Sequence, residues 1–155
     1  MLLTLCETIK GMVIRMTTLN KTYSEAITIP DYLERFRYLK LSGKVGVDTF
    51  GHDRYLNQIL YSSPEWKRFR RDIILRDQGC DLGHEDYEIY GKILIHHINP
   101  ITIEDVLRRD PSIFDPENVI STTMLTHNAI HYGDENLLMT GPIERRPNDT
   151  CPWRR

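Results

Sequence analysis

The stretch GKILIHHINPITIEDVLRRDPSIFDPENVISTTMLTHNAIHYG, from Gly91 to Gly133, decides the fold of this chain. It holds four of the six histidines, in two pairs with Asn118 between them: His96, His97, His127 and His131. Residues 93–95 and 119–122 are short apolar runs rich in β-branched side chains, and they predict two strands. Thr122 or Thr123 is placed to cap a helix that ends at Gly133.

The connection between these two strands has its own signals for where a strand, a helix and a loop begin or end. Pro100 ends the first strand, and Thr102 can cap a short helix that runs through Leu107. The pairs Asp110-Pro111 and Asp115-Pro116 predict a loop. The order strand, connection, strand, helix predicts an α+β fold.

The histidine pairs differ in what their spacing allows. Neighbouring residues on a strand point to opposite faces, so His96 and His97 should have different roles. His127 and His131 lie four apart on a helix and share one face, where they can bind one ion together. A hairpin packed on that helix would complete a site of three imidazoles with His96, leaving positions for water and phosphate.

His97 would stand free beside this site. A neutral imidazole can take a proton from water, while the ion neutralises phosphate charge and stabilises the leaving oxygen. Asn118 could clamp the loop through its side-chain amide. A lone histidine is more often structural than a ligand, so the prediction depends on the conjunction of both pairs with Asn118.

A basic helix precedes this segment, in SPEWKRFRRDIILRD. Ser63 can cap it, and Pro64 suits its first position. The side chains expected to face inward are Trp66, Phe69, Ile73 and Ile74, and those expected to face outward are Lys67, Arg68, Arg70, Arg71 and Arg76. A solvated helix face would explain this charge, but its position directly before the histidines favours phosphate contacts by Lys67, Arg68 and Arg71.

We expect an N-terminal extension over residues 1–61, the main domain over 62–133 and a surface tail over 134–155. Pro30-Asp31 opens a helix with Tyr32, Phe36 and Leu39 on one side, and the glycines of residues 41–57 predict turns. Residues 1–15 are either a false start, with translation from Met12 or Met16, or a short helix packed on the domain.

The composition bounds the class of protein. A net charge of −2 excludes a uniformly basic nucleic-acid binder, although not a local basic patch. The cysteines Cys6, Cys80 and Cys151 form no CxxC pair, which favours a reducing compartment. We find neither an apolar run long enough to cross a bilayer nor a signal peptide, and we therefore expect a cytosolic protein with no membrane partner.

The motifs IHHINPI, DPENVI and LTHNAIHYG resemble the His-Asn-His (HNH) endonucleases, and the resemblance covers Trp66 to Gly133. The flanks are similar to HNH proteins of tailed bacteriophages and prophages. The family implies a ββα-metal core with flanking helices that hydrolyses DNA to 5′-phosphate and 3′-hydroxyl ends. By this resemblance His96 and His127 bind the metal, His97 is the general base, and Asn118 orders the loop and backs the base. His131 matches a third ligand of colicin-type DNases. Phage terminase and other packaging proteins are the partners that the resemblance implies.

The chain departs from the family in one respect. Many HNH proteins carry two CxxC pairs that hold a structural zinc, but here Cys80 stands without a partner and Thr126 occupies a position in the second pair. We therefore expect no structural zinc. Side chains expected to hold the finger by packing instead are Ile93, Ile95, Val119, Leu125 and Ile130.

Several alternatives stay open. The catalytic ion is a divalent cation, and Mg²⁺, Mn²⁺, Ni²⁺ and Zn²⁺ are all compatible with the ligands. The finger could instead be a non-catalytic DNA-binding or packaging-complex module, and a metal-dependent toxin or RNase is a third interpretation. No base-reading module is visible, so specificity is expected to be low or supplied by a partner.

Overall fold

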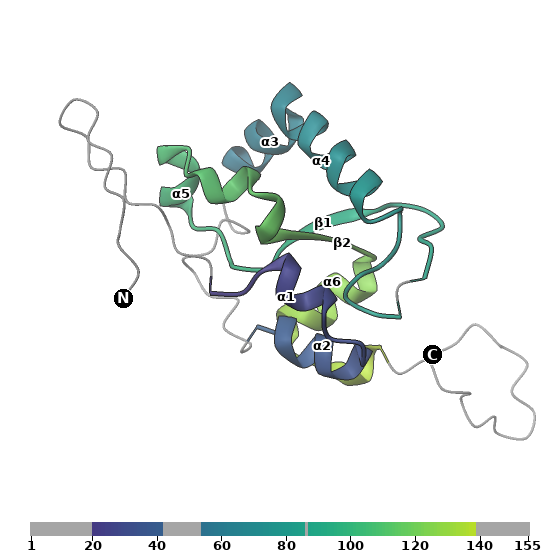
Figure 1. Cartoon of the computed structure of the whole chain (residues 1–155). Helices are drawn as coiled ribbons and strands as arrows, with labels where there is room; N and C mark the ends of the chain where they lie inside the picture. Colours follow the sequence, from purple (N-terminus) through teal and green to yellow (C-terminus); the bar gives the residue numbers. More distant parts are fainter. Residues whose placement is uncertain (1–19, 42–53, 86, 139–155) are drawn as a thin grey trace, which may run out of the picture.

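The computed structural model describes residues 20–41, 54–85 and 87–138 (Figure 1). A two-stranded antiparallel sheet lies at the centre, with α4 on one side and α6 on the other (Figure 1). The mixture of helices and a small sheet confirms the α+β class. No helix in these ranges is both long and apolar enough to cross a membrane.

The α-helices are α1 (Tyr23–Ile27), α2 (Tyr32–Leu39), α3 (Arg54–Ser62), α4 (Pro64–Arg76), α5 (Ile103–Arg108) and α6 (Met124–Tyr132). The strands are β1 (Leu94–His97) and β2 (Val119–Thr122). Short 3-10 helices are η2 (Pro111–Phe114), η3 (Pro116–Asn118) and η4 (Glu135–Leu137).

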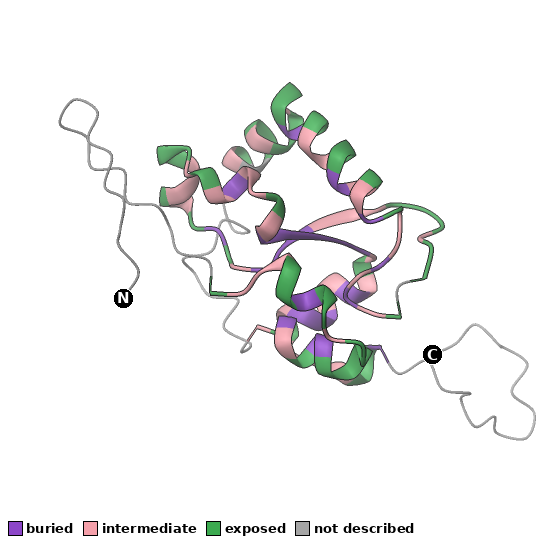
Figure 2. Ribbon diagram, viewed as in Figure 1, coloured by how far each residue is buried: buried purple, intermediate pink, exposed green. Residues whose placement is uncertain are grey.

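The hairpin forms where the sequence predicts it. Leu94 pairs with Thr122, and His97 pairs with Val119. The first strand includes both histidines, whereas the sequence placed them at its end. Every residue of β2 is buried, because α4 and α6 cover its two faces (Figure 2).

Side-chain caps fix the helices after each strand. Thr123 accepts a hydrogen bond from the Thr126 amide at the start of α6, and Gly133 ends that helix with φ of 66°. Thr102 and Asp105 form a reciprocal capping box on α5, as the predicted short helix requires. The region predicted as a loop contains η2 and η3, because Asp110 and Asp115 each cap one turn.

Helix α4 begins at Pro64 with Ser63 as its cap, as predicted, and Trp66 and Ile73 are buried. The prediction that Arg70 and Arg76 point outward is wrong. Arg70 donates to the Ile93 carbonyl at 2.8 Å, ahead of β1. Arg76 donates to the Val119 carbonyl at 2.8 Å and to that of Pro116. These two guanidinium groups attach α4 to the hairpin instead of facing solvent.

The main core joins the hairpin to helices that come earlier in the chain. Its buried members include Ala26, Phe36, Leu39, Ile98, Ile120 and Ile130. Part of the expected N-terminal extension therefore shares a core with β2, α6 and Ile98, the residue that follows β1. Of the side chains expected to hold the finger, Val119 and Ile130 are fully buried, while Ile93, Ile95 and Leu125 are only half-buried. Of the three residues expected on one side of α2, Phe36 and Leu39 are buried, while Tyr32 in the first turn is 36% exposed.

A second, smaller core lies on the other side of the hairpin. Ile101 and Ile113 are its buried members, and Leu56 and Leu60 of α3 pack against it. The turns predicted across residues 41–57 are wrong from Arg54 onward, where α3 begins. The earlier glycines, residues 1–15 and the tail from residue 139 lie outside the described ranges.

Candidate metal centre

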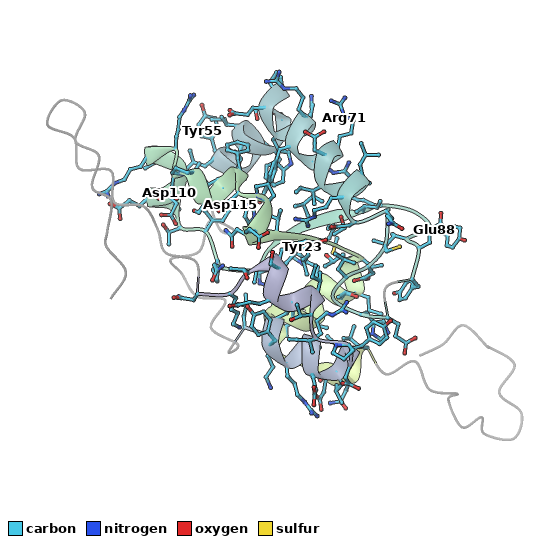
Figure 3. The ribbon with its side chains drawn as sticks, viewed as in Figure 1. Tyr23, Tyr55, Arg71, Glu88, Asp110 and Asp115 are labelled. Atoms are coloured by element: carbon cyan, nitrogen blue, oxygen red, sulfur yellow. The ribbon has the colours of Figure 1, made fainter. Side chains whose placement is uncertain are left out.

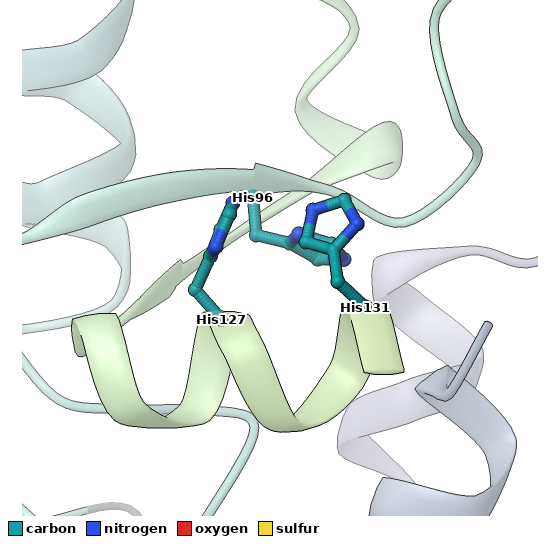
Figure 4. Close-up of side chains that lie close together, drawn as sticks. All are labelled: His96, His127 and His131. Carbon is teal, nitrogen blue, oxygen red and sulfur yellow. The ribbon is translucent and has the colours of Figure 1, made fainter. Parts of the chain in front are cut away.

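Three imidazoles from two elements meet under β1. His127 and His131 rise from α6 toward the strand, and His96 turns from the strand toward the helix (Figure 4). One ligand nitrogen from each ring lies within 4.8 Å of the others. The ring centroids are 5.3 Å apart for His96 and His127, 5.0 Å for His96 and His131, and 4.4 Å for His127 and His131. The structure thus brings together the three residues predicted as ligands.

Local geometry explains this grouping. Because α6 has 3.6 residues per turn, residues four apart point the same way. Since β1 alternates its side chains, His96 faces α6 while His97 faces α4. The buried hydroxyl of Thr126 and the cap at Thr123 hold the first turn of α6 in place, so His127 starts from a fixed position.

Burial leaves this cluster short of hydrogen-bond partners. His96 Nε2 and His127 Nδ1 are both buried without a partner among the described atoms. Burial, followed by the proximity of His127 and His131, lowers the pKa of His96 well below its ordinary value. Burial also lowers the pKa of His127, and burial together with His127 lowers that of His131 to about 4. At neutral pH the three rings are therefore uncharged, and each has a lone pair to donate.

These features fit a divalent metal ion. Unpaired buried nitrogens are costly, and a bound cation would satisfy both of them. Zn–N bonds are about 2.1 Å long, so two nitrogens on one ion lie at most about 4.2 Å apart. The separations of up to 4.8 Å exceed this limit by about 0.6 Å, so the rings would have to move closer together to share one ion. Three protein ligands leave coordination positions for water or phosphate, as in catalytic sites.

His97 lies on the opposite face of β1, against Trp66 of α4 and the backbone of η2. Its Nε2 is 3.0 Å from the Ile113 carbonyl, and its ring stacks on Trp66 at 5.7 Å. The expectation that His97 stands free is therefore wrong, since η2 and α4 both contact it. A carbonyl can only accept, so Nε2 carries the proton, and Nδ1 of the neutral ring is the basic atom. Burial lowers the pKa of His97 to about 4, although the carbonyl bond opposes this shift.

Asn118 clamps the two ends of the connection between the strands. Its Oδ1 accepts hydrogen bonds from the Asn99 backbone at 3.0 Å and the Asn99 side chain at 2.7 Å. Its Nδ2 donates to the Ser112 carbonyl at 3.0 Å, in the turn beside Ile113. Asn118 therefore holds η2, and with η2 the carbonyl that orients His97.

The basic residues expected to contact phosphate lie on the outer surface of α4. Lys67, Arg68 and Arg71 are all exposed, and Arg71 projects away from the sheet (Figure 3). Arg71 lies 4.0 Å from Asp72, in an ion pair of which both members are more than two-thirds exposed. Since these cations are not committed to the fold, they are available to a polyanion.

Two buried carboxylates that the sequence analysis did not single out organise the site. Asp77 accepts from the Ser121 amide at 2.7 Å, and Asp81 accepts from Thr126 Oγ1 at 2.6 Å and the Thr123 amide at 2.9 Å. Asp81 and Thr126 thus bond to each other between the turn after α4 and the first turn of α6. Aspartates near turns are common in any sequence, so no sequence signal distinguished Asp77 and Asp81 from aspartates at the surface.

Comparisons with models of protein families, with curated proteins and with solved structures find no match to this chain. The residues and their geometry are therefore the basis for the proposals that follow.

Proposed function

We propose that this protein is a divalent-metal-dependent endonuclease that hydrolyses DNA phosphodiester bonds on a ββα-metal finger of the HNH type. The observation that carries the proposal is the meeting of His96, His127 and His131 between β1 and α6, with two buried nitrogens lacking partners. The antiparallel hairpin followed by α6 is compatible with that finger.

Each part of the site has a role in this proposal. His96, His127 and His131 would hold the cation, which when bound neutralises phosphate oxygen and stabilises the leaving group. His97 would accept the proton of the attacking water at Nδ1, while the Ile113 carbonyl fixes its tautomer. Asn118 would position His97 through Ser112 and η2.

Contacts with the DNA backbone would come from the outer face of α4. Lys67, Arg68 and Arg71 would bind phosphates without reading sequence, and this binding would weaken with salt. A phage or prophage source, and a role in genome packaging beside a terminase, belong to the same proposal and are supported by the similarity of the flanking sequences.

The test is cleavage of supercoiled plasmid by the purified chain with Mg²⁺, Mn²⁺, Ni²⁺ or Zn²⁺, and with EDTA. We expect nicked or linear product with at least one ion. His97→Ala should abolish cleavage and keep metal affinity, whereas His127→Ala should weaken both. His84→Ala is the matched control, because His84 packs on Tyr87 outside the cluster.

A non-catalytic DNA-binding module that retains the ββα-metal fold is the second candidate. The enclosure of His97 by Trp66 and Ile113 favours it, because a base must reach water. Metal and DNA binding by the unsubstituted chain with no cleavage under any ion would select this candidate. Cleavage that persists in His97→Ala would remove His97 from its role as base.

A further inference from the structure

Lys21 lies at the edge of the metal centre, although nothing in the motif predicts a role for it. Asn99 holds its backbone from both sides: Oδ1 accepts from the Lys21 amide at 3.2 Å, and Nδ2 donates to the Lys21 carbonyl at 2.8 Å. Asn99 itself is bonded to Asn118. The segment at Lys21 is therefore attached to the chain just beyond the end of β1.

The side chain of Lys21 connects this point to α6. Its Nζ donates to the Lys40 carbonyl at 3.1 Å, and the next residue, Leu41, donates its amide to the Ile130 carbonyl at 3.0 Å. Ile130 precedes His131 in α6. The ammonium is thus bonded to the segment that attaches beside His131, while the backbone of Lys21 is bonded to Asn99, two residues beyond the end of the strand that carries His96.

This charge has no anionic partner among the described residues. Lys21 is half-buried and forms no ion pair with a carboxylate of the described ranges. Its neighbours are a carbonyl and the Tyr38 ring, 5.8 Å from Nζ. The three imidazoles add no negative charge. A partly desolvated ammonium without a counter-ion makes binding of an anion favourable.

We propose that Lys21 is a phosphate-binding residue of the metal centre, which would hold one phosphate between its ammonium and the cation bound by His96, His127 and His131. The inference rests on the proposed function and names a contact to the scissile group itself. A compact ammonium on a flexible stem suits a phosphate oxygen, and it can turn from the Lys40 carbonyl to reach one. Asn118 and Asn99 thereby position the phosphate-binding residue as well as η2.

The test measures phosphate and metal binding separately from cleavage. Inorganic phosphate is titrated into the Co²⁺-loaded protein, and the visible absorption of Co²⁺ reports on the change of its ligands. We expect Lys21→Met to weaken phosphate binding on the order of tenfold, as for loss of one charged hydrogen bond. Co²⁺ affinity should be unchanged or tighter, because a like charge has been removed. Lys21→Arg should restore most of the phosphate affinity.

Lys40→Met is the matched control, since it removes an exposed ammonium nearby and keeps the carbonyl that Lys21 contacts. If Lys21 serves only to cap the end of α2, Lys21→Met will lower thermal stability and leave phosphate affinity at the unsubstituted value. That result overturns the inference, as does a failure of the unsubstituted chain to bind Co²⁺. Lys21-dependent phosphate binding in a protein that cuts no DNA would retain this inference and overturn the nuclease. Cleavage that is unaffected by Lys21→Met would overturn this inference and retain the proposed nuclease.

Discussion

The carboxylate of Asp81 accepts a hydrogen bond from the hydroxyl of Thr126 at 2.6 Å, and both residues are fully buried. The same carboxylate accepts from the amides of Gly83 and Thr123. It therefore ties the turn after α4 to the first turn of α6. The hydrogen bond between the Asp81 carboxylate and the Thr126 hydroxyl therefore holds in place the helix that carries His127 and His131.

Removing the hydroxyl at this contact should destabilise the protein. Thr126→Val keeps the shape of the side chain but leaves Asp81 with one acceptor site unpaired in the interior. We expect the free energy of unfolding to fall by about 1–3 kcal/mol, measured by urea denaturation. Thr28→Val is the control, because Thr28 is exposed and its loss should change stability by less than about 0.5 kcal/mol. Equal losses of stability in Thr126→Val and Thr28→Val would contradict a stabilising role for the hydrogen bond between Thr126 and Asp81.

Binding of a divalent cation should stabilise the folded chain. A ligand that binds only the native state adds about 2.7 kcal/mol at a hundred times its Kd. We expect Ni²⁺ or Zn²⁺ to raise the Tm, and EDTA to reverse the rise. His131→Ala should reduce the shift and His84→Ala should not. A shift that survives loss of His96 and His127 together would place the ion elsewhere.

Acid should destabilise the protein partly through His97. Because the folded pKa of His97 is about 4 and the unfolded value is near 6.5, the unfolded chain binds a proton first as pH falls. The contribution of His97 is thus complete above pH 6.5 and is lost between 6.5 and 4. At about 1.36 kcal/mol per pKa unit, the loss approaches about 3 kcal/mol. We expect the free energy of unfolding of His97→Phe, measured by urea denaturation, to fall less steeply between pH 6.5 and 4 than that of the unsubstituted chain. The same slope for the two proteins would contradict this role of His97.

Two arginines of α4 should separate stability from DNA binding. Arg76→Met removes the donor to the Val119 carbonyl and the partner of buried Asp77, so unfolding should become easier by about 2–4 kcal/mol. Arg71→Met should leave stability unchanged, weaken binding to duplex DNA and reduce the salt slope by about one. Fluorescence anisotropy at several salt concentrations measures the second effect. A salt slope that Arg71→Met leaves unaltered would exclude Arg71 from the interface.

Loss of the Asn118 amide should loosen the segments that it joins. Asn118→Ala removes the acceptor of the Asn99 amide and the donor to Ser112. We expect faster hydrogen exchange at the Asn99 amide and weaker phosphate binding through Lys21, with metal affinity nearly unchanged. Asn136→Ala is the control, since Asn136 is exposed and its partner is the neighbouring Asp134. An unchanged rate of hydrogen exchange at the Asn99 amide in Asn118→Ala would contradict the role of Asn118 in holding this segment.

The sequence was sufficient for the elements whose signals are local. The cap at Ser63, the hairpin strands and α6 with its terminal glycine each follow from residues within a few positions of one another. The spacing of His127 and His131 and the alternation at His96 were likewise sufficient to predict their meeting. These signals depend on periodicity, which is fixed by backbone geometry.

What the sequence did not predict depends on contacts between distant segments. Arg76 has the pattern of a surface residue on α4, but Val119, far along the chain, accepts its hydrogen bond. Asp81 and Thr126 find each other across a similar separation. The enclosure of His97 arises because the connection after β1 folds back as η2 and places Ile113 over the ring. No local pattern encodes such pairings.

The pairing of His96 with Ile120 in the hairpin has a consequence for how this site could be lost. A slip of one residue would exchange the two histidines, sending His97 toward α6 and His96 toward Trp66. Every chemical group would still be present, yet the wrong ring would face the ion. Asn118 opposes this slip at two points, because its backbone carbonyl accepts from the Ile98 amide while its side chain accepts from the Asn99 amide. Any residue at this position could provide the first bond, whereas only a side chain with a suitably placed acceptor can provide the second, so loss of the amide would weaken the hold on the register without removing it.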